Sequence, residues 1–163
     1  MSKTKRISIS SIITPLKKSN AKSKMNRKTK NMRHRCINNE KKSHIVRIFL
    51  EMLNVVKLYH WKTKSFSQHK ATDELYGKLN EHIDSFVEVL LGKDQSRIKM
   101  VEKNIHLMDY SNRKDFQSRM FEYRSFLTDM NIYFDSSRDS DLLNIRDEIL
   151  GNINQFLYLM TFE

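Results

Sequence analysis

The chain has 163 residues, of which three are Gly and one is Pro. A chain of this length is expected to fold as one domain with a substantial core, and so few chain-breaking residues favour long helices over a design of short strands. A single cysteine, Cys36, excludes an intrachain disulfide and favours a reducing compartment. No apolar run is long enough to span a membrane and no secretory signal is recognisable, so we expect an intracellular protein that is not secreted.

Positive charge is concentrated in the first 42 residues. They contain 14 Lys and Arg and one acid, a net charge of +13, whereas residues 43–163 carry −2. Because residues 1–42 are rich in Lys, Ser and Asn and have little to bury, we predict a disordered basic arm. Such a polycation binds DNA phosphates without reading the base sequence. The candidate nucleic-acid contacts are Lys17, Lys18, Lys22, Lys24, Arg27, Lys28, Lys30, Arg33 and Arg35.

The composition of the arm also fits roles that do not involve DNA. It is compatible with a nuclear-localisation signal, an organelle transit peptide or a solvated tail. Aromatic residues are absent before Phe49, so the arm is not expected to stack on bases. Residues 6–16 form an apolar island that is a candidate docking segment. Binding of nucleic acid would place the protein in a nucleoid, a nucleus or a virion.

The first long helix is predicted from Ser43 to about Lys64. Its apolar residues recur at helical spacing together with one histidine: Ile45, Ile48, Phe49, Met52, Leu53, Val56 and His60. His60 therefore lies on the buried stripe. A lone histidine in such a place is usually a core residue with its hydrogen bonds satisfied, and the residues that follow favour a different interpretation.

The second helix is predicted to begin after a cap at Ser65 or Ser67 and to end at Gly92. Its apolar stripe consists of Leu75, Leu79, Ile83, Phe86 and Leu90. A second arc of about 100° holds His69, Asp73, Asp84 and Glu88. Because Val87 and Leu91 lie beside this arc, we expect it not to face solvent. Carboxylates among apolar side chains are costly to ionise without a compensating cation, which favours a bound metal.

The four polar residues of the arc form two pairs. His69 lies one turn from Asp73, and Asp84 one turn from Glu88, but the pairs are 15 residues apart, about 22 Å along the axis. One helix therefore cannot bring them to a single metal centre. An antiparallel second copy related by a two-fold axis would place each pair opposite the other, with His60 joining from the preceding helix. This oxygen-rich mixed set suits iron better than structural zinc.

This stretch resembles the Dps-type miniferritins, which belong to the ferritin-like superfamily. The resemblance rests on His60-Trp61, on H-x3-D at His69 and on D-x3-E at Asp84. It implies a ferritin-like four-helix bundle that assembles as a homo-oligomer, a dimer at least and a shell of twelve in the family. It also implies a di-iron ferroxidase site between subunits, whose catalytic and metal-binding residues are His60, His69, Asp73, Asp84 and Glu88. The connection between His60 and His69 is a few residues shorter than in the bacterial members.

A second resemblance concerns the same stretch together with the run D-S-D-L-L-N-I-R-D-E-I-L-G-N-I-N-Q-F-L-Y-L near the C-terminus. Both are similar to ferritin-like proteins of large DNA viruses. The family resemblance further implies that residues 93–111 form a crossover with a short helix. A third helix is predicted after a cap at Ser111 or Asn112, and a fourth from about Asp139.

The last two helices are predicted to contribute core residues rather than ligands. The third buries Phe116, Met120, Tyr123, Leu127, Met130 and Phe134, and the fourth buries Leu142, Ile145, Ile149, Ile153, Phe156 and Met160. Bundles that hold two metals inside one subunit use E-x-x-H motifs, and this sequence contains none. Any metal site is therefore expected between subunits.

The sequence thus predicts an all-α protein with an arm over residues 1–42 and a ferritin-like bundle over residues 43–163. The favoured function is that of an iron-oxidising miniferritin that binds DNA through its arm. One alternative is a non-enzymatic DNA-packaging or virion structural protein that keeps the bundle as a scaffold, with the polar arc as an interface strip. Another is a helical adaptor protein whose arm serves only as a nuclear-localisation signal.

Overall fold

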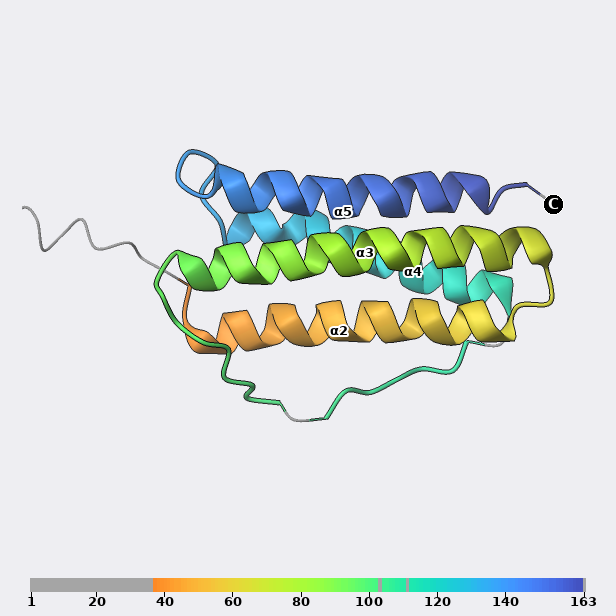
Figure 1. Cartoon of the computed structure of the whole chain (residues 1–163), viewed down its shortest axis with the longest axis horizontal. Coiled ribbons are helices and arrows are strands. Elements are labelled where there is room, and N and C mark those ends of the chain that lie inside the picture. Colours follow the sequence, from red (N-terminus) through yellow and green to blue (C-terminus); the bar gives the residue numbers. More distant parts are fainter. Residues whose placement is uncertain (1–36, 103, 111, 163) are drawn as a thin grey trace, which may run out of the picture. The chain divides into compact units, whose positions relative to one another are not determined.

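The computed structural model describes residues 37–102, 104–110 and 112–162, and this part of the chain contains helices and no strand. Its long helices are α2 (Asn39–Lys62), α3 (Phe66–Gly92), α4 (Arg113–Asp129) and α5 (Ser140–Leu159), and the short 3-10 helix η1 (Met130–Ile132) follows α4. The four long helices pack side by side as one bundle (Figure 1). The all-α prediction is confirmed, and the basic arm contacts predicted at residues 17–35 lie outside the described residues.

Helix ends follow the expected capping chemistry. The side chain of Ser65 accepts a hydrogen bond from the Gln68 amide, and that of Asn112 accepts one from the Asp115 amide. A side-chain acceptor at this position satisfies an amide that has no partner within the helix. The predicted caps at these two residues are confirmed, and α3 ends at Gly92 as expected.

The first helix begins earlier than predicted. It starts at Asn39, four residues before Ser43, and its cap is Asn38. The buried Lys42 donates to the carboxylate of Asp94 and to the hydroxyl of Ser96. Residues 39–42 therefore belong to the folded bundle and not to an arm, because they are part of α2 and the side chains of Asn39 and Lys42 contact the segment that follows α3.

The core is formed by one apolar stripe from each long helix. The fully buried large side chains include Phe49, Phe86, Phe116, Met120, Tyr123, Leu127, Leu142 and Ile149. Aromatic rings join the stripes: Tyr59 of α2 stacks on Phe116 of α4 with centroids 3.8 Å apart, and Phe116 meets Phe156 of α5 edge-on. The predicted core of α3, α4 and α5 is confirmed except at Ile145, which is half-buried.

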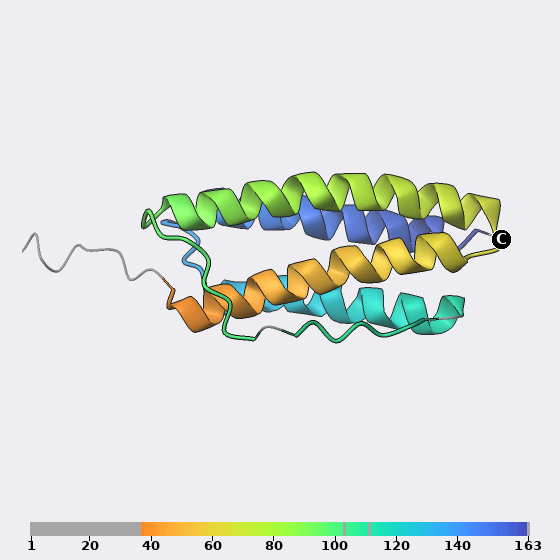
Figure 2. The same cartoon turned by 60° about the horizontal axis from the view of Figure 1, so that its bottom comes forward.

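The connection between α3 and α4 contains no helix in its described residues, so the predicted crossover helix is wrong. Instead it runs the length of the bundle along α2, and α3 and α4 consequently point in the same direction (Figures 1 and 2). Side chains of α2 hold its backbone: Asn39 donates to the Lys99 carbonyl at 2.8 Å, and the Val101 amide donates to the Ser43 hydroxyl at 2.8 Å. These contacts satisfy two main-chain groups that a helix would have paired internally.

None of the helices in the described part of the chain is both long enough and apolar enough to cross a membrane.

Candidate metal-binding surface

His60 and His69 each contact the main chain of the other where α2 meets α3, and we call this pair the histidine clasp. The Nδ1 atom of His60 lies 3.0 Å from the main-chain carbonyl oxygen of His69, and Nδ1 of His69 lies 3.0 Å from the carbonyl oxygen of His60. The two rings are stacked with their centroids 3.9 Å apart. A carbonyl oxygen only accepts, so each Nδ1 must carry its hydrogen. In each neutral ring the lone pair is therefore on Nε2, the nitrogen available to a metal.

The buried hydroxyl of Thr72 contacts both members of the histidine clasp. Thr72 is fully buried, and its Oγ1 lies 2.8 Å from the Gln68 carbonyl and 3.0 Å from that of His69. The same oxygen is 3.3 Å from Nδ1 of His60. Tyr59 adds a further tie, because its hydroxyl donates to the side-chain oxygen of Gln68 at 2.7 Å. The His60 ring is thus oriented by Thr72 as well as by His69.

One carboxylate of the predicted set reaches this histidine pair. Oδ1 of Asp73 lies 3.8 Å from Nε2 of His60 and 3.8 Å from the ammonium of Lys57. Lys57 in turn lies over the ring of Tyr76, with Nζ 4.7 Å from the centroid. The structure therefore brings His60, His69 and Asp73 together and adds a lysine that the sequence did not indicate.

Asp84 and Glu88 lie farther along α3, and both are exposed to solvent. The expectation that the polar arc would not face solvent is therefore wrong for the single chain. α3 packs against α2 and against α5; His69 and Asp73 of the arc contact α2, whereas Asp84 and Glu88 lie in neither contact. Within one copy, the described residues contain no group of three or more His, Cys, Asp or Glu side chains placed to hold a metal ion.

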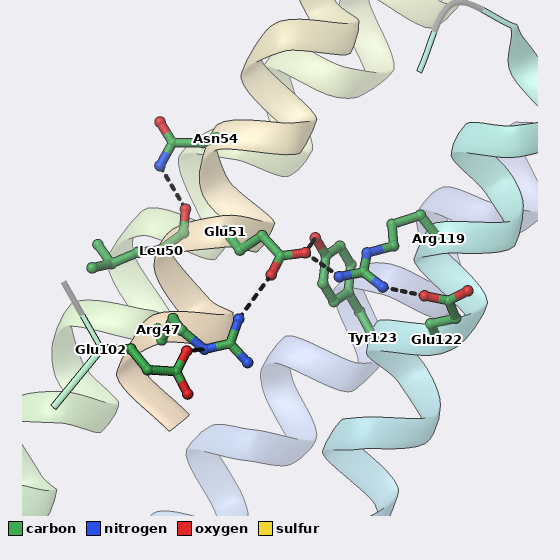
Figure 3. A network of polar contacts seen from close by, with 8 residues as sticks. All are labelled: Arg47, Leu50, Glu51, Asn54, Glu102, Arg119, Glu122 and Tyr123. Carbon is green, nitrogen blue, oxygen red and sulfur yellow. Dashed lines mark hydrogen bonds and ion pairs between the residues drawn. The ribbon is translucent and has the colours of Figure 1, made fainter. Parts of the chain in front are cut away.

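A second polar cluster lies inside the bundle and was missed by sequence reasoning (Figure 3). Glu51 of α2 is only 3% exposed, and its carboxylate accepts hydrogen bonds from Arg119 and, at 3.0 Å, from the Tyr123 hydroxyl, both on α4. Arg47 approaches the same carboxylate at 3.4 Å and pairs with Glu102 of the connection at 2.8 Å. The carboxylate of Glu51 is thus occupied by cations and a phenol of the protein itself.

Burial governs the protonation of this cluster. It raises the pKa of the Tyr123 hydroxyl well above its ordinary value. Burial acts to lower the pKa of the Arg119 guanidinium, but its hydrogen bonds to Glu51, Tyr123 and Glu122 outweigh that effect and raise the pKa. A visible signal existed in the sequence, because Glu51 falls between Ile48 and Val55 in a helical apolar pattern. The pattern does not indicate which residues bond the Glu51 carboxylate, because Arg119 and Tyr123 lie on another helix.

Residues 60–160 match the model of a family of unknown function, DUF5856. The chain belongs to this family. The DUF5856 region begins at His60 and includes His69, Asp73, Asp84 and Glu88, whereas α2 lies before it except for its last turn. No curated protein and no solved structure matches the chain. Membership of this family assigns no activity to the chain.

Proposed function

We propose that this protein is a ferritin-like miniferritin subunit that binds and oxidises Fe(II) between two copies of the chain. The observation that carries the proposal is the histidine clasp. It leaves an Nε2 lone pair on His60 and another on His69, and the Asp73 carboxylate lies beside the first of them. Metal-binding histidines typically donate their second ring nitrogen to a carbonyl or carboxylate in this way.

The second half of the site is proposed to come from a partner copy. One copy supplies a single carboxylate at the histidine pair, while the exposed Asp84 and Glu88 lie on the same arc of α3, about 22 Å or more from His69 along the axis. An antiparallel copy would place the partner's carboxylates opposite the histidines, and the same two-fold axis would repeat the arrangement at the other end. A mixed set of imidazole and carboxylate suits iron.

The connectivity supports the same proposal. Ferritin-like bundles differ from simple up-and-down bundles by one long crossover, and the connection between α3 and α4 runs along the whole bundle (Figure 2). The buried Glu51 also supports an intersubunit location, because bundles with intrasubunit sites use interior carboxylates as metal ligands, and Arg119 and Tyr123 already bond this one.

In the proposed reaction Fe(II) is the substrate and loses one electron to an oxidant from solution. His60 and His69 would bind it through neutral Nε2, and Asp73 with the partner's Asp84 and Glu88 would favour the higher charge of Fe(III). The basic arm would hold the assembly on DNA through its phosphates, combining compaction with removal of reactive iron.

The proposal is tested by anaerobic titration with Fe(II), with the oligomer mass recorded on the same sample. We expect saturation at two irons for each site in an assembly of about twelve copies, as in the miniferritins that the sequence resembles. Asp84→Ala with Glu88→Ala should abolish oxidation and leave DNA binding intact. Asp129→Ala with Glu148→Ala, which removes exposed carboxylates from α4 and α5, is the matched control and should change neither.

Deletion of the arm should have the opposite effect, loss of DNA binding with retained oxidation. The deletion should stop at residue 36, because α2 and its cap begin at Asn38 and Lys42 is buried. Loss of both functions in either variant would contradict this division of labour.

A scaffold without enzymatic activity is the second candidate, and Lys57 is the observation that favours it. Its ammonium already lies beside Asp73 and compensates that carboxylate without a metal. On this alternative the protein packages DNA or builds a virion, and the polar arc is an interface strip. A folded assembly that binds DNA but takes up no saturable Fe(II) would establish the scaffold in place of the enzyme.

A further inference from the structure

A hollow lies between the start of α3 and the end of α5, on a different flank of α3 from the histidine clasp. It has a volume of about 280 Å³ and is lined by residues of both helix ends, among them Ser67, Lys70, Glu74 and Phe162. The clasp faces α2, whereas Lys78, one turn beyond Glu74, reaches Gln155 of α5. The hollow therefore does not share the surface proposed to bind iron.

Aromatic rings are exposed at the edges of this hollow. Phe66, which precedes Ser67, is 75% exposed, and Phe162 is 55% exposed. Tyr158 is also exposed and meets Phe162 edge-on, with centroids 5.1 Å apart. Apolar rings left in water are unfavourable, and a group of them at one end of a bundle indicates a surface that meets a partner.

Lysines lie on the α3 side of these rings. Residues 61–70 contain three lysines and no Asp or Glu; Lys62 pairs with Asp109, and Nζ of Lys70 lies 5.8 Å from the centroid of the Phe66 ring. Lys64 is exposed between the two helices. The one acid of the hollow, Glu74, is paired with Lys78 at 2.7 Å. The partner should therefore combine flat apolar groups with negative charge.

We propose that this end of the bundle, formed by Phe66, Phe162, Lys64 and Lys70, binds single-stranded nucleic acid. Bases would stack on the two phenylalanine rings, and the lysines would contact the phosphates, which is how proteins bind single strands without reading their sequence. Duplex DNA keeps its bases stacked internally and offers only phosphates. The site supplies the base stacking that the arm lacks, since the arm contains no aromatic residue. It does not depend on the iron site.

The test compares a single-stranded oligothymidylate with a duplex of the same length, using the full chain and fluorescence anisotropy at matched salt concentrations. Phe66→Ala and Phe162→Ala should each weaken single-strand binding about fivefold or more. Duplex affinity, which the arm dominates, should change little. Phe121→Ala is the matched control, because Phe121 is a 44% exposed phenylalanine with Arg124 4.7 Å from its ring.

Lys70→Gln should weaken single-strand binding and reduce its dependence on salt by about one phosphate contact. Equal loss from the Phe121 control, or an equal loss for single strand and duplex, would overturn the proposal. So would a fall in oligomer mass in the Phe66 or Phe162 variant, which would assign the surface to a second copy. Preferential binding to anionic vesicles would assign it to a membrane surface instead. Because Fe(II) uptake is measured separately, failure here leaves the proposed iron site standing.

Discussion

Glu51 and Arg119 form an ion pair inside the bundle, between α2 and α4, although 68 residues separate them in the chain. Glu51 is buried, and Arg119 is largely covered by the same contact. Arg119 also pairs with Glu122 and lies over the ring of Tyr123 (Figure 3). The pair therefore ties α4 to α2, because each charge would keep only the partner on its own helix if the helices separated, Arg47 for Glu51 and Glu122 for Arg119.

Removing one charge of this pair should be costly, whereas removing both should not. Arg119→Met leaves the buried Glu51 with Tyr123 and the more distant Arg47, and we expect the free energy of unfolding to fall by about 3 kcal/mol. Glu51→Met combined with Arg119→Met should recover most of that loss, because an apolar pair carries no desolvation penalty. Urea denaturation of the wild type and the variants measures the difference. A double variant no more stable than Arg119→Met would contradict this interpretation of the pair.

The shared iron site predicts complementation between two inactive variants. Asp73→Ala removes the carboxylate beside His60, and Asp84→Ala with Glu88→Ala removes the proposed partner ligands. When the two proteins are refolded together, half of the dimers should contain one of each and restore one of their two sites. Oxidation should then recover to about a quarter of the wild-type rate from random pairing alone.

Each variant refolded with itself is the control and should remain inactive. Because Asp73, Asp84 and Glu88 are all exposed, the substitutions should not disturb folding, which a thermal melt checks. Absence of recovery in a mixture shown by mass to contain mixed dimers would rule out a site shared between copies.

Much of the bundle could be predicted because its determinants are local. Apolar spacing located the stripe of α3, and Ser65, Gly92 and Asn112 marked helix ends through capping chemistry. The connection after α3 could not be predicted in the same way. Its extended form depends on side chains of α2, such as Ser43. The Ser43 hydroxyl accepts a hydrogen bond from the Val101 amide, which lies 58 residues later in the chain.

The residues of the candidate site could be predicted from their types and spacing, but the contacts between them could not. The spacing of His69 and Asp73 predicted two candidate ligands one turn apart, with His60 joining from the preceding helix, and the structure places these three together. The exchange of Nδ1 hydrogen bonds depends on how the turn between α2 and α3 aligns two carbonyl groups. Lys57 was not indicated, because its distance to Asp73 depends on the packing of one helix against the other.

Lys57 should weaken metal binding at Asp73, because its ammonium competes for the same oxygen atom. Lys57→Met should raise the affinity for Fe(II) about two- to fivefold, a modest effect because the pair is partly exposed. An anaerobic binding isotherm measures the change. Lys78→Met is the matched control, since it breaks the Lys78–Glu74 pair on the same helix face as the hollow. Equal affinities for the Lys57 variant and the wild type would show that the lysine does not compete.

The ion pair between Lys42 and Asp94 should make stability depend on pH in the acid range. The hydrogen bond from Lys42, with one from Ser96, holds the pKa of Asp94 below its ordinary value of 3.8. A carboxyl group whose pKa is lower in the folded state contributes stability above its unfolded pKa, and this contribution is lost as the pH falls through the folded value. Asp94→Asn removes the charge and leaves the buried Lys42 ammonium with Ser96 alone. We expect a loss of about 2 kcal/mol at neutral pH.

The difference in unfolding free energy between the wild type and Asp94→Asn should therefore be constant above about pH 5 and should shrink below about pH 4. Urea denaturation at a series of pH values measures it. Asp109→Asn is a suitable control, because Asp109 also pairs with a lysine, Lys62, but both groups are exposed. Its effect should stay below about 1 kcal/mol throughout. A difference for Asp94→Asn that persists unchanged to pH 2 would show that Lys42 is stabilised by contacts other than this carboxylate.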